Sequence, residues 1–470
     1  MLKYGPKVEA KAVDILHSTG LCHMAWLRDL ESTRFFIEQG GNVNAQNKDG
    51  ETALTESSRH GNVDVVKLLL EHGSNLEVAL HVHHWTPLLQ AVRDNRLEVA
   101  KVLLDYGANM HAKLLSGNDA VAEACFYGYH EIARSLIERG SRLESLNFAG
   151  QTPLFEASRR NDDDWTCWLL RRVAKIDVRD GDGWSPVWHA ANGGHHRSLA
   201  TLLEYNSPTD TLDNGNWLPL GCAAYEGHYE CVKLLLDVGA DTNVHQAHGS
   251  SYTSLCEASH HGRVDVVRLF LERGANMEIG SKSGFSALSV AEVNGQDAVV
   301  RVLAEAGADL NKPGFTKKDP NLSPTPLMRA TIAEETSTAL LLIELGASIN
   351  LCDAEGKTAL LHAAEQSNPA VVAALLARGA DVNARSTRKQ ETALMHAVVR
   401  GNIEVALLLL EAKANTSLEE WRGRPAWVLA KQHNQDRKLE PLLGPGHVGD
   451  DAEVLRKSRK KARSMILRGI

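Results

Sequence analysis

The chain has no apolar stretch long enough to cross a membrane, and its charged residues amount to 23% with a net charge of −8. Its first seven residues do not lead into the apolar core of a signal peptide. These absences exclude a membrane-spanning protein and disfavour a secreted one. We therefore expect a soluble chain without a transmembrane segment.

Cysteine is scarce and unpatterned, because the seven cysteines include no C-x-x-C pair. Four of them fall in expected helices where a small apolar side chain is wanted: Cys125, Cys222, Cys231 and Cys256. An odd, unpatterned set indicates reduced thiols. The expected localisation is intracellular and cytoplasmic, with the nucleus as an alternative.

The sequence also lacks the motifs of an enzyme. It contains no phosphate-binding glycine loop, and no Ser/His/Asp arrangement can be argued from its spacing. His81, His83 and His84 have the spacing of metal ligands, but no cysteine lies near them and no ligand set is complete. We predict no catalytic residue, no cofactor and no metal site.

The sequence does contain a long internal repeat. A threonine, or a residue in its place, recurs at intervals of 33 to 39 residues, most of them 33. These positions are Thr52, Thr86, Asp119, Thr152, Ser185, Leu218, Thr253, Ser286, Thr325, Thr358, Thr392 and Pro425. A glycine follows nine residues later at Gly61, Gly128, Gly194, Gly227, Gly262, Gly295 and Gly401.

The clearest unit covers residues 356–383 and predicts two short helices joined by a turn. Thr358 can cap the first helix, and Asn368 can cap the second with Pro369 at its first position. Gly379 is placed to end the second helix in the left-handed conformation. Helices this short are unstable alone, so each unit needs similar neighbours.

A 33-residue period of a turn and two helices resembles the ankyrin repeat. The resemblance covers about residues 9–443 and implies an all-α solenoid of about thirteen helix–turn–helix units with β-turn or hairpin fingers. The first and last repeats are degenerate, and residues 312–324 make one long finger. Residues 1–8 and a basic tail at 444–470 remain outside the repeats, and neither is long enough for a catalytic domain.

The resemblance implies that the fingertip and the first helix of each repeat touch the partner. The residue before the threonine position is aromatic in four consecutive repeats, at Trp184, Trp217, Tyr252 and Phe285. Exposed aromatic residues are enriched at binding hot spots. The alternative is that these rings pack along the stack against the next finger.

The other candidate partner-binding residues come from the same fingertip and first-helix positions. They are Trp85, Phe126, Tyr127, Arg159, Arg160 and Tyr225. We expect a different role for Trp165 and Trp168, which stand at second-helix positions and should lie in the core. Trp188 takes the place of a frequent histidine of the family and should also be structural.

The tail differs from the repeats in charge, with a net charge of +4 against −12 for residues 1–443. Its basic run consists of Arg456, Lys457, Arg459, Lys460, Lys461 and Arg463. The run fits a solvated end, a nuclear-import signal or a helix that meets an acidic membrane surface. Direct nucleic-acid binding by the acidic repeats is disfavoured, because phosphates would repel them.

These features favour a non-catalytic scaffold or adaptor that presents a concave surface to one or more proteins or extended peptides. One alternative is a regulatory subunit or substrate receptor that brings clients to a separate enzyme. Another is an anchor that contacts a membrane surface through the basic tail.

Overall fold

The computed structural model describes residues 20–47, 50–79, 84–245, 252–281, 285–314 and 322–433. The chain divides into two compact units, Met1–Asn214 (unit 1) and Gly215–Ile470 (unit 2). Several sequence predictions lie wholly or partly outside the described residues. They concern residues 1–8, the start of the first repeat, the histidines 81 and 83, most of the 312–324 finger, the end of the last repeat and the basic tail.

The described part of unit 1 contains six pairs of helices, each a first helix of seven or eight residues and a second of nine. They are α1 (Gly20–Leu27), α2 (Leu30–Glu38), α3 (Ala53–His60), α4 (Val63–Glu71), α5 (Pro87–Arg93), α6 (Leu97–Asp105), α7 (Ala120–Tyr127), α8 (His130–Glu138), α9 (Pro153–Arg159), α10 (Asp163–Arg171), α11 (Pro186–Asn192) and α12 (His196–Glu204).

Unit 2 repeats this arrangement in six further pairs and one more helix within its described residues. The helices are α13 (Pro219–Glu226), α14 (Tyr229–Asp237), α15 (Ser254–His260), α16 (Val264–Glu272), α17 (Ala287–Val293), α18 (Asp297–Glu305), α19 (Pro326–Ile332), α20 (Thr336–Glu344), α21 (Ala359–Glu365), α22 (Pro369–Ala377), α23 (Ala393–Arg400), α24 (Ile403–Glu411) and α25 (Ala426–Gln432).

The predicted all-α architecture is confirmed. In the described ranges the only β-type pairings are two isolated antiparallel bridges, Cys352 with Thr358 and Glu419 with Pro425. Both bridges close a finger at its base. A second helix for the last repeat would fall beyond residue 433, so the count of thirteen repeats stays a prediction.

The helices begin and end largely where the repeat pattern places them. In the unit at 356–383, the Asn368 side chain accepts from the Val371 amide, Pro369 opens α22 and Gly379 has a φ of 84°. The prediction for Thr358 is wrong, because this residue precedes α21 without a side-chain cap, and its buried hydroxyl has no hydrogen-bond partner in the described part of the chain. The hydroxyl of Thr52, by contrast, caps α3.

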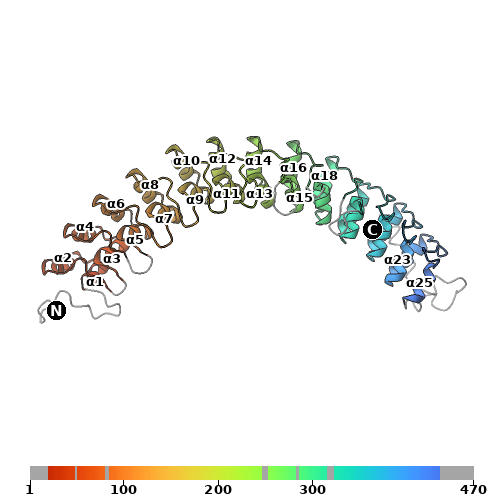
Figure 1. Ribbon diagram of the computed structural model, residues 1–470, viewed down its shortest axis with the longest axis horizontal. Helices are drawn as coiled ribbons and strands as arrows, with labels where there is room; N and C mark the ends of the chain where they lie inside the picture. Colours follow the sequence, from red (N-terminus) through yellow and green to blue (C-terminus); the bar gives the residue numbers. More distant parts are fainter. Residues whose placement is uncertain are drawn as a thin grey trace. The chain divides into compact units, whose positions relative to one another are not determined.

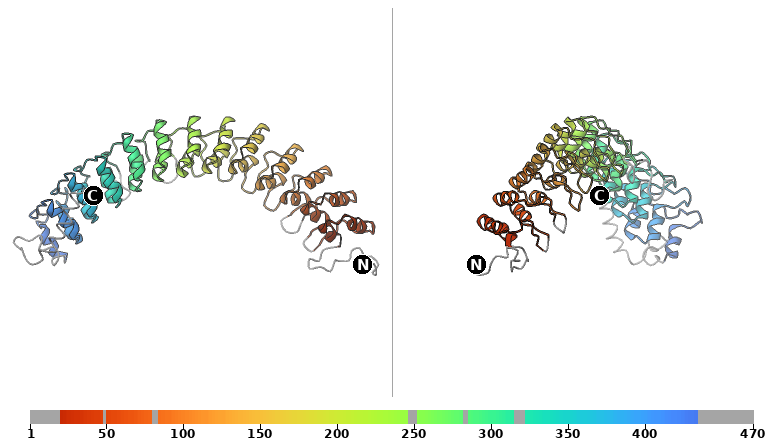
Figure 2. Two further views of the ribbon diagram at one scale, coloured as in Figure 1. Left: turned by 180° about the vertical axis from the view of Figure 1, so that it is seen from behind. Right: turned by 60° about the vertical axis from the view of Figure 1, so that its left-hand side comes forward.

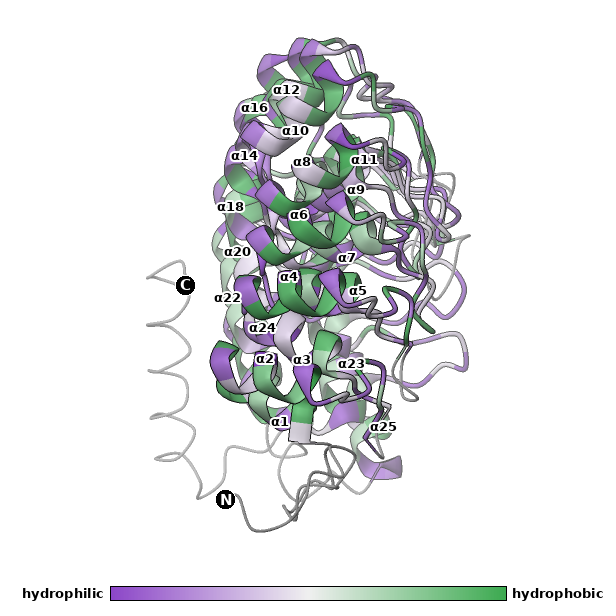
Figure 3. Cartoon of the chain, turned by 90° about the vertical axis from the view of Figure 1, so that its left-hand side faces the viewer, coloured by the Kyte–Doolittle hydropathy of each residue, from purple (hydrophilic) through white to green (hydrophobic). Residues whose placement is uncertain are grey.

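Within each unit the helices stack in two layers. First helices pack side by side, α3 between α1 and α5 and α15 between α13 and α17, and second helices do the same, α4 between α2 and α6 (Figures 1 and 2). The core lies between these layers and includes Leu69, Leu103 and Phe270. Figure 3 shows the apolar residues of α4, α6 and α7 in green along the helices.

Hydrogen bonds from one finger to the next align the repeats of each unit. In unit 1 the Gly181 amide donates to the Ala149 carbonyl at 3.2 Å, and in unit 2 the Thr387 amide donates to the Glu355 carbonyl at 2.8 Å. In two of the repeats a buried imidazole contacts an aspartate of the finger. His189 lies 3.2 Å from Asp180, and His362 lies 2.7 Å from Asp353. The side chains on the fingers are therefore held on a rigid frame.

Candidate functional site

An aromatic pocket opens at the fingertips of unit 1 and has a volume of about 320 Å³. Three consecutive repeats build it, with one ring before α5, two at the end of α7 and a fourth on the finger that leads to α9. The pocket is lined by Trp85, Arg93, Leu114, Leu115, Ser116, Asn118, Glu123, Phe126, Tyr127 and Phe148. The structure thus brings together Trp85, Phe126 and Tyr127 from the residues predicted by sequence.

The rim of this pocket is apolar and exposed. Leu115 and Phe148 are each 66% exposed, and Tyr127 is 40% exposed. Phe126 lies edge-on to both Tyr127 and Phe148, with ring centroids 5.2 and 6.4 Å apart. Large exposed apolar side chains that cluster in this way usually mark a binding surface.

The floor of the pocket is polar and held in place. The Asn118 side chain donates to Glu123 at 2.8 Å and accepts from the Phe148 amide at 3.0 Å, so it ties the two fingers together. Burial raises the pKa of Glu123, against the opposing effects of the Asn118 hydrogen bond and the Arg93 charge. The Arg93 guanidinium lies over the Trp85 ring, 4.8 Å from its centroid.

Sequence reasoning missed Leu115, Phe148 and Arg93. The sequence could have indicated two of them. Leu115 and Phe148 each stand two residues before a finger glycine, where an apolar side chain has no core to enter. Trp85 is 8% exposed and covered by Arg93, and its predicted role in partner binding stays a prediction.

The two arginines predicted at the partner surface, Arg159 and Arg160, are exposed but already engaged within unit 1. Arg159 pairs with the buried Glu156 at 2.8 Å. Arg160 donates to the carbonyl of Phe126, and this places its guanidinium beside the aromatic pocket. Their predicted role in partner binding stays a prediction.

Trp184 packs along the stack, as the alternative interpretation holds. It is half-buried, stacks on Trp188 with centroids 4.4 Å apart, and donates from its indole nitrogen to Asp213 on the next finger at 3.0 Å. Trp188 is 7% exposed, so its predicted structural role is confirmed.

Trp165 and Trp168 differ from each other, although the sequence predicts both in the core. Trp165 is 2% exposed, which confirms the prediction. The prediction for Trp168 is wrong, because this half-buried ring stacks on Trp165 and is covered by Arg134 and Arg172, 5.2 and 4.7 Å from its centroid.

In unit 2 the predicted aromatic residues surround a pair of histidines. Trp217 lies edge-on to Tyr225 at 5.5 Å, and Tyr225 contacts His261 at 4.1 Å between ring centroids. Tyr252 is 6% exposed and lies edge-on to His260, and its predicted role in partner binding stays a prediction. Phe285 is half-buried.

The fourth residue after the threonine position is a buried glutamate in four repeats, and three of these glutamates have a close partner. Glu56 pairs with Arg59 at 3.0 Å, and Glu123 and Glu156 have the partners given above. The fourth, Glu257, is 6% exposed and has no hydrogen bond or ion pair among the described residues.

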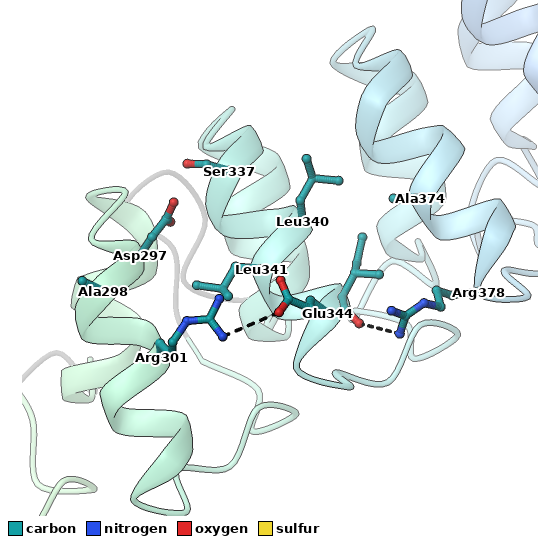
Figure 4. A pocket seen from close by; sticks show the side chains of 10 residues that line it. Asp297, Ala298, Arg301, Ser337, Leu340, Leu341, Glu344, Ala374 and Arg378 are labelled. Carbon is teal, nitrogen blue, oxygen red and sulfur yellow. Dashed lines mark hydrogen bonds and ion pairs between the residues drawn. The ribbon is translucent and has the colours of Figure 1, made fainter. Parts of the chain in front are cut away.

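A wider groove, of about 510 Å³, lies over α18, α20 and α22 in unit 2 (Figure 4). Its charged side chains are occupied: Arg301 lies 3.6 Å from Glu344, and Arg378 donates to the Ile343 carbonyl at 3.0 Å. The aromatic pocket of unit 1 offers exposed rings instead, and we place the candidate site there.

Family models of ankyrin repeats match residues 21–114, 157–246, 239–314 and 313–386, and a single-repeat model matches residues 389–419. The chain belongs to the ankyrin-repeat family, whose fold binds proteins and is generally non-enzymatic. No helix in the described ranges has the length and apolar character needed to span a bilayer.

The curated relatives match over part of their length. The chain is 35% identical over 98 residues to an ankyrin repeat protein of Acanthamoeba polyphaga mimivirus, which covers 20% of this chain and 60% of the viral protein. It is 35% identical over 106 residues to an ankyrin repeat-containing protein of Treponema pallidum (strain Nichols), which covers 23% of this chain and 36% of that protein. Both stretches span less than two thirds of the relative.

Among solved structures, the human ASB11 ankyrin repeat domain is similar to this chain. The match has a TM-score of 0.42 and 25% sequence identity, and it covers 48% of this chain and 98% of that domain.

Proposed function

We propose that this chain is a non-catalytic adaptor or scaffold, and that a partner protein binds at the aromatic pocket of unit 1. The exposed cluster of Leu115, Tyr127 and Phe148 around that pocket carries the proposal. Burial of these side chains by a partner would remove apolar surface from water, which is the main favourable term in association.

The pocket suits an apolar anchor on an extended segment of the partner. Its volume of about 320 Å³ can hold a large aromatic or branched aliphatic side chain. Arg93 is exposed beside Trp85, so its N–H groups can donate to a carboxylate or carbonyl of the partner. The fingers are already fixed by hydrogen bonds, so binding loses little conformational entropy on this side.

The test is affinity capture from cell extract with the intact chain as bait, followed by quantitative mass spectrometry. The double variant Leu115→Ser/Phe148→Ser removes the exposed rim without touching the core. We expect it to recover the main partner at least ~10-fold less well, as for loss of an interface hot spot. Circular dichroism confirms that the variant is folded.

A matched control is Val173→Ser, which removes an apolar side chain that is 85% exposed after α10 in the same unit. We expect this variant to capture the partner as the wild type does. Equal capture by all three proteins would show that the aromatic pocket is not the binding surface.

A further inference from the structure

Glu257, His260 and His261 form a cluster of three metal-binding side chains at the end of α15 in unit 2. One ligand atom from each residue lies within 4.8 Å of the others. The spacing explains the geometry, because residues three and four positions apart share one face of a helix. Glu257 therefore lies one turn below the two imidazoles.

We propose that these three residues bind a zinc ion. One carboxylate and two imidazoles are the donor set of open zinc sites, in which a fourth position is left for water or another ligand. Both histidines are half-buried, so the outward side of the ion would reach solvent or a partner side chain.

The buried carboxylate supplies an independent observation. Glu257 is 6% exposed, and no hydrogen bond or ion pair reaches it from the part of the chain that the structure describes. Its counterparts in other repeats, Glu56, Glu123 and Glu156, all have an arginine or an amide within reach. A buried anion without a partner is costly, and a bound cation would remove that cost.

The surroundings orient the two imidazoles. His260 and His261 stack with centroids 4.6 Å apart, and Tyr252 and Tyr225 pack against their other sides. Around zinc, tetrahedral ligand atoms at bonds of about 2 Å lie roughly 3.3 Å apart. Rotation of the side chains must therefore bring the three atoms closer together.

Some charged groups near the cluster disfavour a bound zinc ion, and others favour it. Burial lowers the pKa of His261, and the charges of His260 and Arg263 add to this effect. The Arg263 guanidinium donates to the Tyr225 carbonyl at 3.0 Å. The positive charge of Arg263 disfavours a zinc ion close to it. A neutral imidazole, however, is the form that binds metal. The neighbouring Glu226 supplies a negative charge that acts against the Arg263 charge at His261.

The repeat that begins at Thr52 provides a variant that should fold. It has Glu56, Arg59 and His60 at the positions of Glu257, His260 and His261, so His260→Arg copies an arrangement that the chain already contains. In this variant the arginine replaces one zinc ligand and gives the carboxylate a cation partner, as Arg59 does for Glu56.

The experiment is calorimetric titration of the metal-free intact chain with Zn²⁺, followed by visible absorption with Co²⁺ to report the ligand geometry. We expect a zinc site whose affinity falls at least ~100-fold in Glu257→Gln, His260→Arg and His261→Gln, since each lacks a ligand. The control His196→Gln alters an exposed histidine of unit 1 and should bind as the wild type does.

The Co²⁺ spectrum of the wild type should show the intense bands of a site with four or five ligands. The proposal is overturned if the wild type binds Zn²⁺ no more tightly than His260→Arg. That result would mean that histidines elsewhere on the surface account for the Zn²⁺ binding.

Discussion

The repeat that begins at Thr52 and the one that begins at Thr253 share a backbone and differ in chemistry. Both threonine hydroxyls cap a short helix, and both helices carry a buried glutamate on their fourth position. Arg59 satisfies the first glutamate, whereas the second faces two histidines. Burial raises the pKa of both glutamates to about 7, and the nearby Glu51 adds to the effect at Glu56.

The comparison shows how a repeat protein acquires distinct sites. Because the repeat frame fixes the backbone, a change at one position alters the local chemistry without altering the fold. The aromatic pocket of unit 1 and the regular unit at 356–383 also differ in their fingertip residues on the same frame. The fingertip of the regular unit is the half-buried Lys357. Substitutions at matched positions can therefore test each site.

The largest effect is expected from breaking the buried pair of Glu292 and Arg329, whose side chains are 0% and 2% exposed. Arg329→Met leaves a carboxylate unpaired in the core and should lower the free energy of unfolding by about 3–5 kcal/mol. Urea unfolding followed by circular dichroism measures the change. The double variant Glu292→Leu/Arg329→Met should regain most of the loss, and a single variant as stable as the wild type would contradict this account.

The second prediction is that substitutions can transfer the zinc site from the repeat that begins at Thr253 to the repeat that begins at Thr52. In a His260→Arg background, Arg59→His completes a set of one carboxylate and two imidazoles around Glu56 and His60. We expect Zn²⁺ affinity to rise by about 100-fold relative to His260→Arg alone, because a missing ligand is restored. If calorimetry finds no gain, the three positions are not sufficient for a metal site.

The third prediction concerns the backbone at the end of the second helix. Val173 has a φ of 64° where Gly140 and Gly239 serve in other repeats, and a left-handed residue with a side chain costs about 1–2 kcal/mol. Val173→Gly should therefore raise the free energy of unfolding by about 1 kcal/mol. The control Val238→Gly changes an exposed valine with a φ of −89° and should give no gain.

The smallest effect is a pH dependence at the floor of the aromatic pocket. Burial raises the pKa of Glu123 in the folded chain, so stability is complete below the unfolded carboxyl pKa and declines as pH rises through the folded value. Glu123→Gln keeps an acceptor for Asn118 and removes this decline. Its urea midpoint should exceed that of the wild type at neutral pH and match it more closely at acid pH.

A control for the last experiment is Glu98→Gln, which removes one charge from an exposed side chain of α6. A constant difference between Glu123→Gln and the wild type across the pH range would contradict the assigned cause.

The sequence predicts the repeat frame because each unit encodes it locally. Asn368 and Pro369 start α22 as expected, and the periodicity places Trp165 in the core. Thr358 fails as a cap although its residue type is right, because the choice of partner depends on local geometry that residue type does not determine.

The site was predicted less well, because it depends on contacts between repeats. Trp168 lies under Arg134 of the preceding repeat, and Phe126 at the end of α7 contacts Phe148 on the next finger. No periodicity in a single repeat reports such contacts. The aromatic pocket likewise needs rings from three consecutive repeats. Glu257 differs from the similar acids because no hydrogen bond or ion pair reaches it from the described residues.

The central claim is that the aromatic pocket of unit 1 receives a partner. Hydrogen–deuterium exchange of the intact chain, with and without the protein that it captures most strongly, tests this directly. We predict slower exchange on binding at residues 114–118 and 147–150, and no change at residues 356–383. Protection that is absent from these two fingers and present elsewhere would contradict the claim.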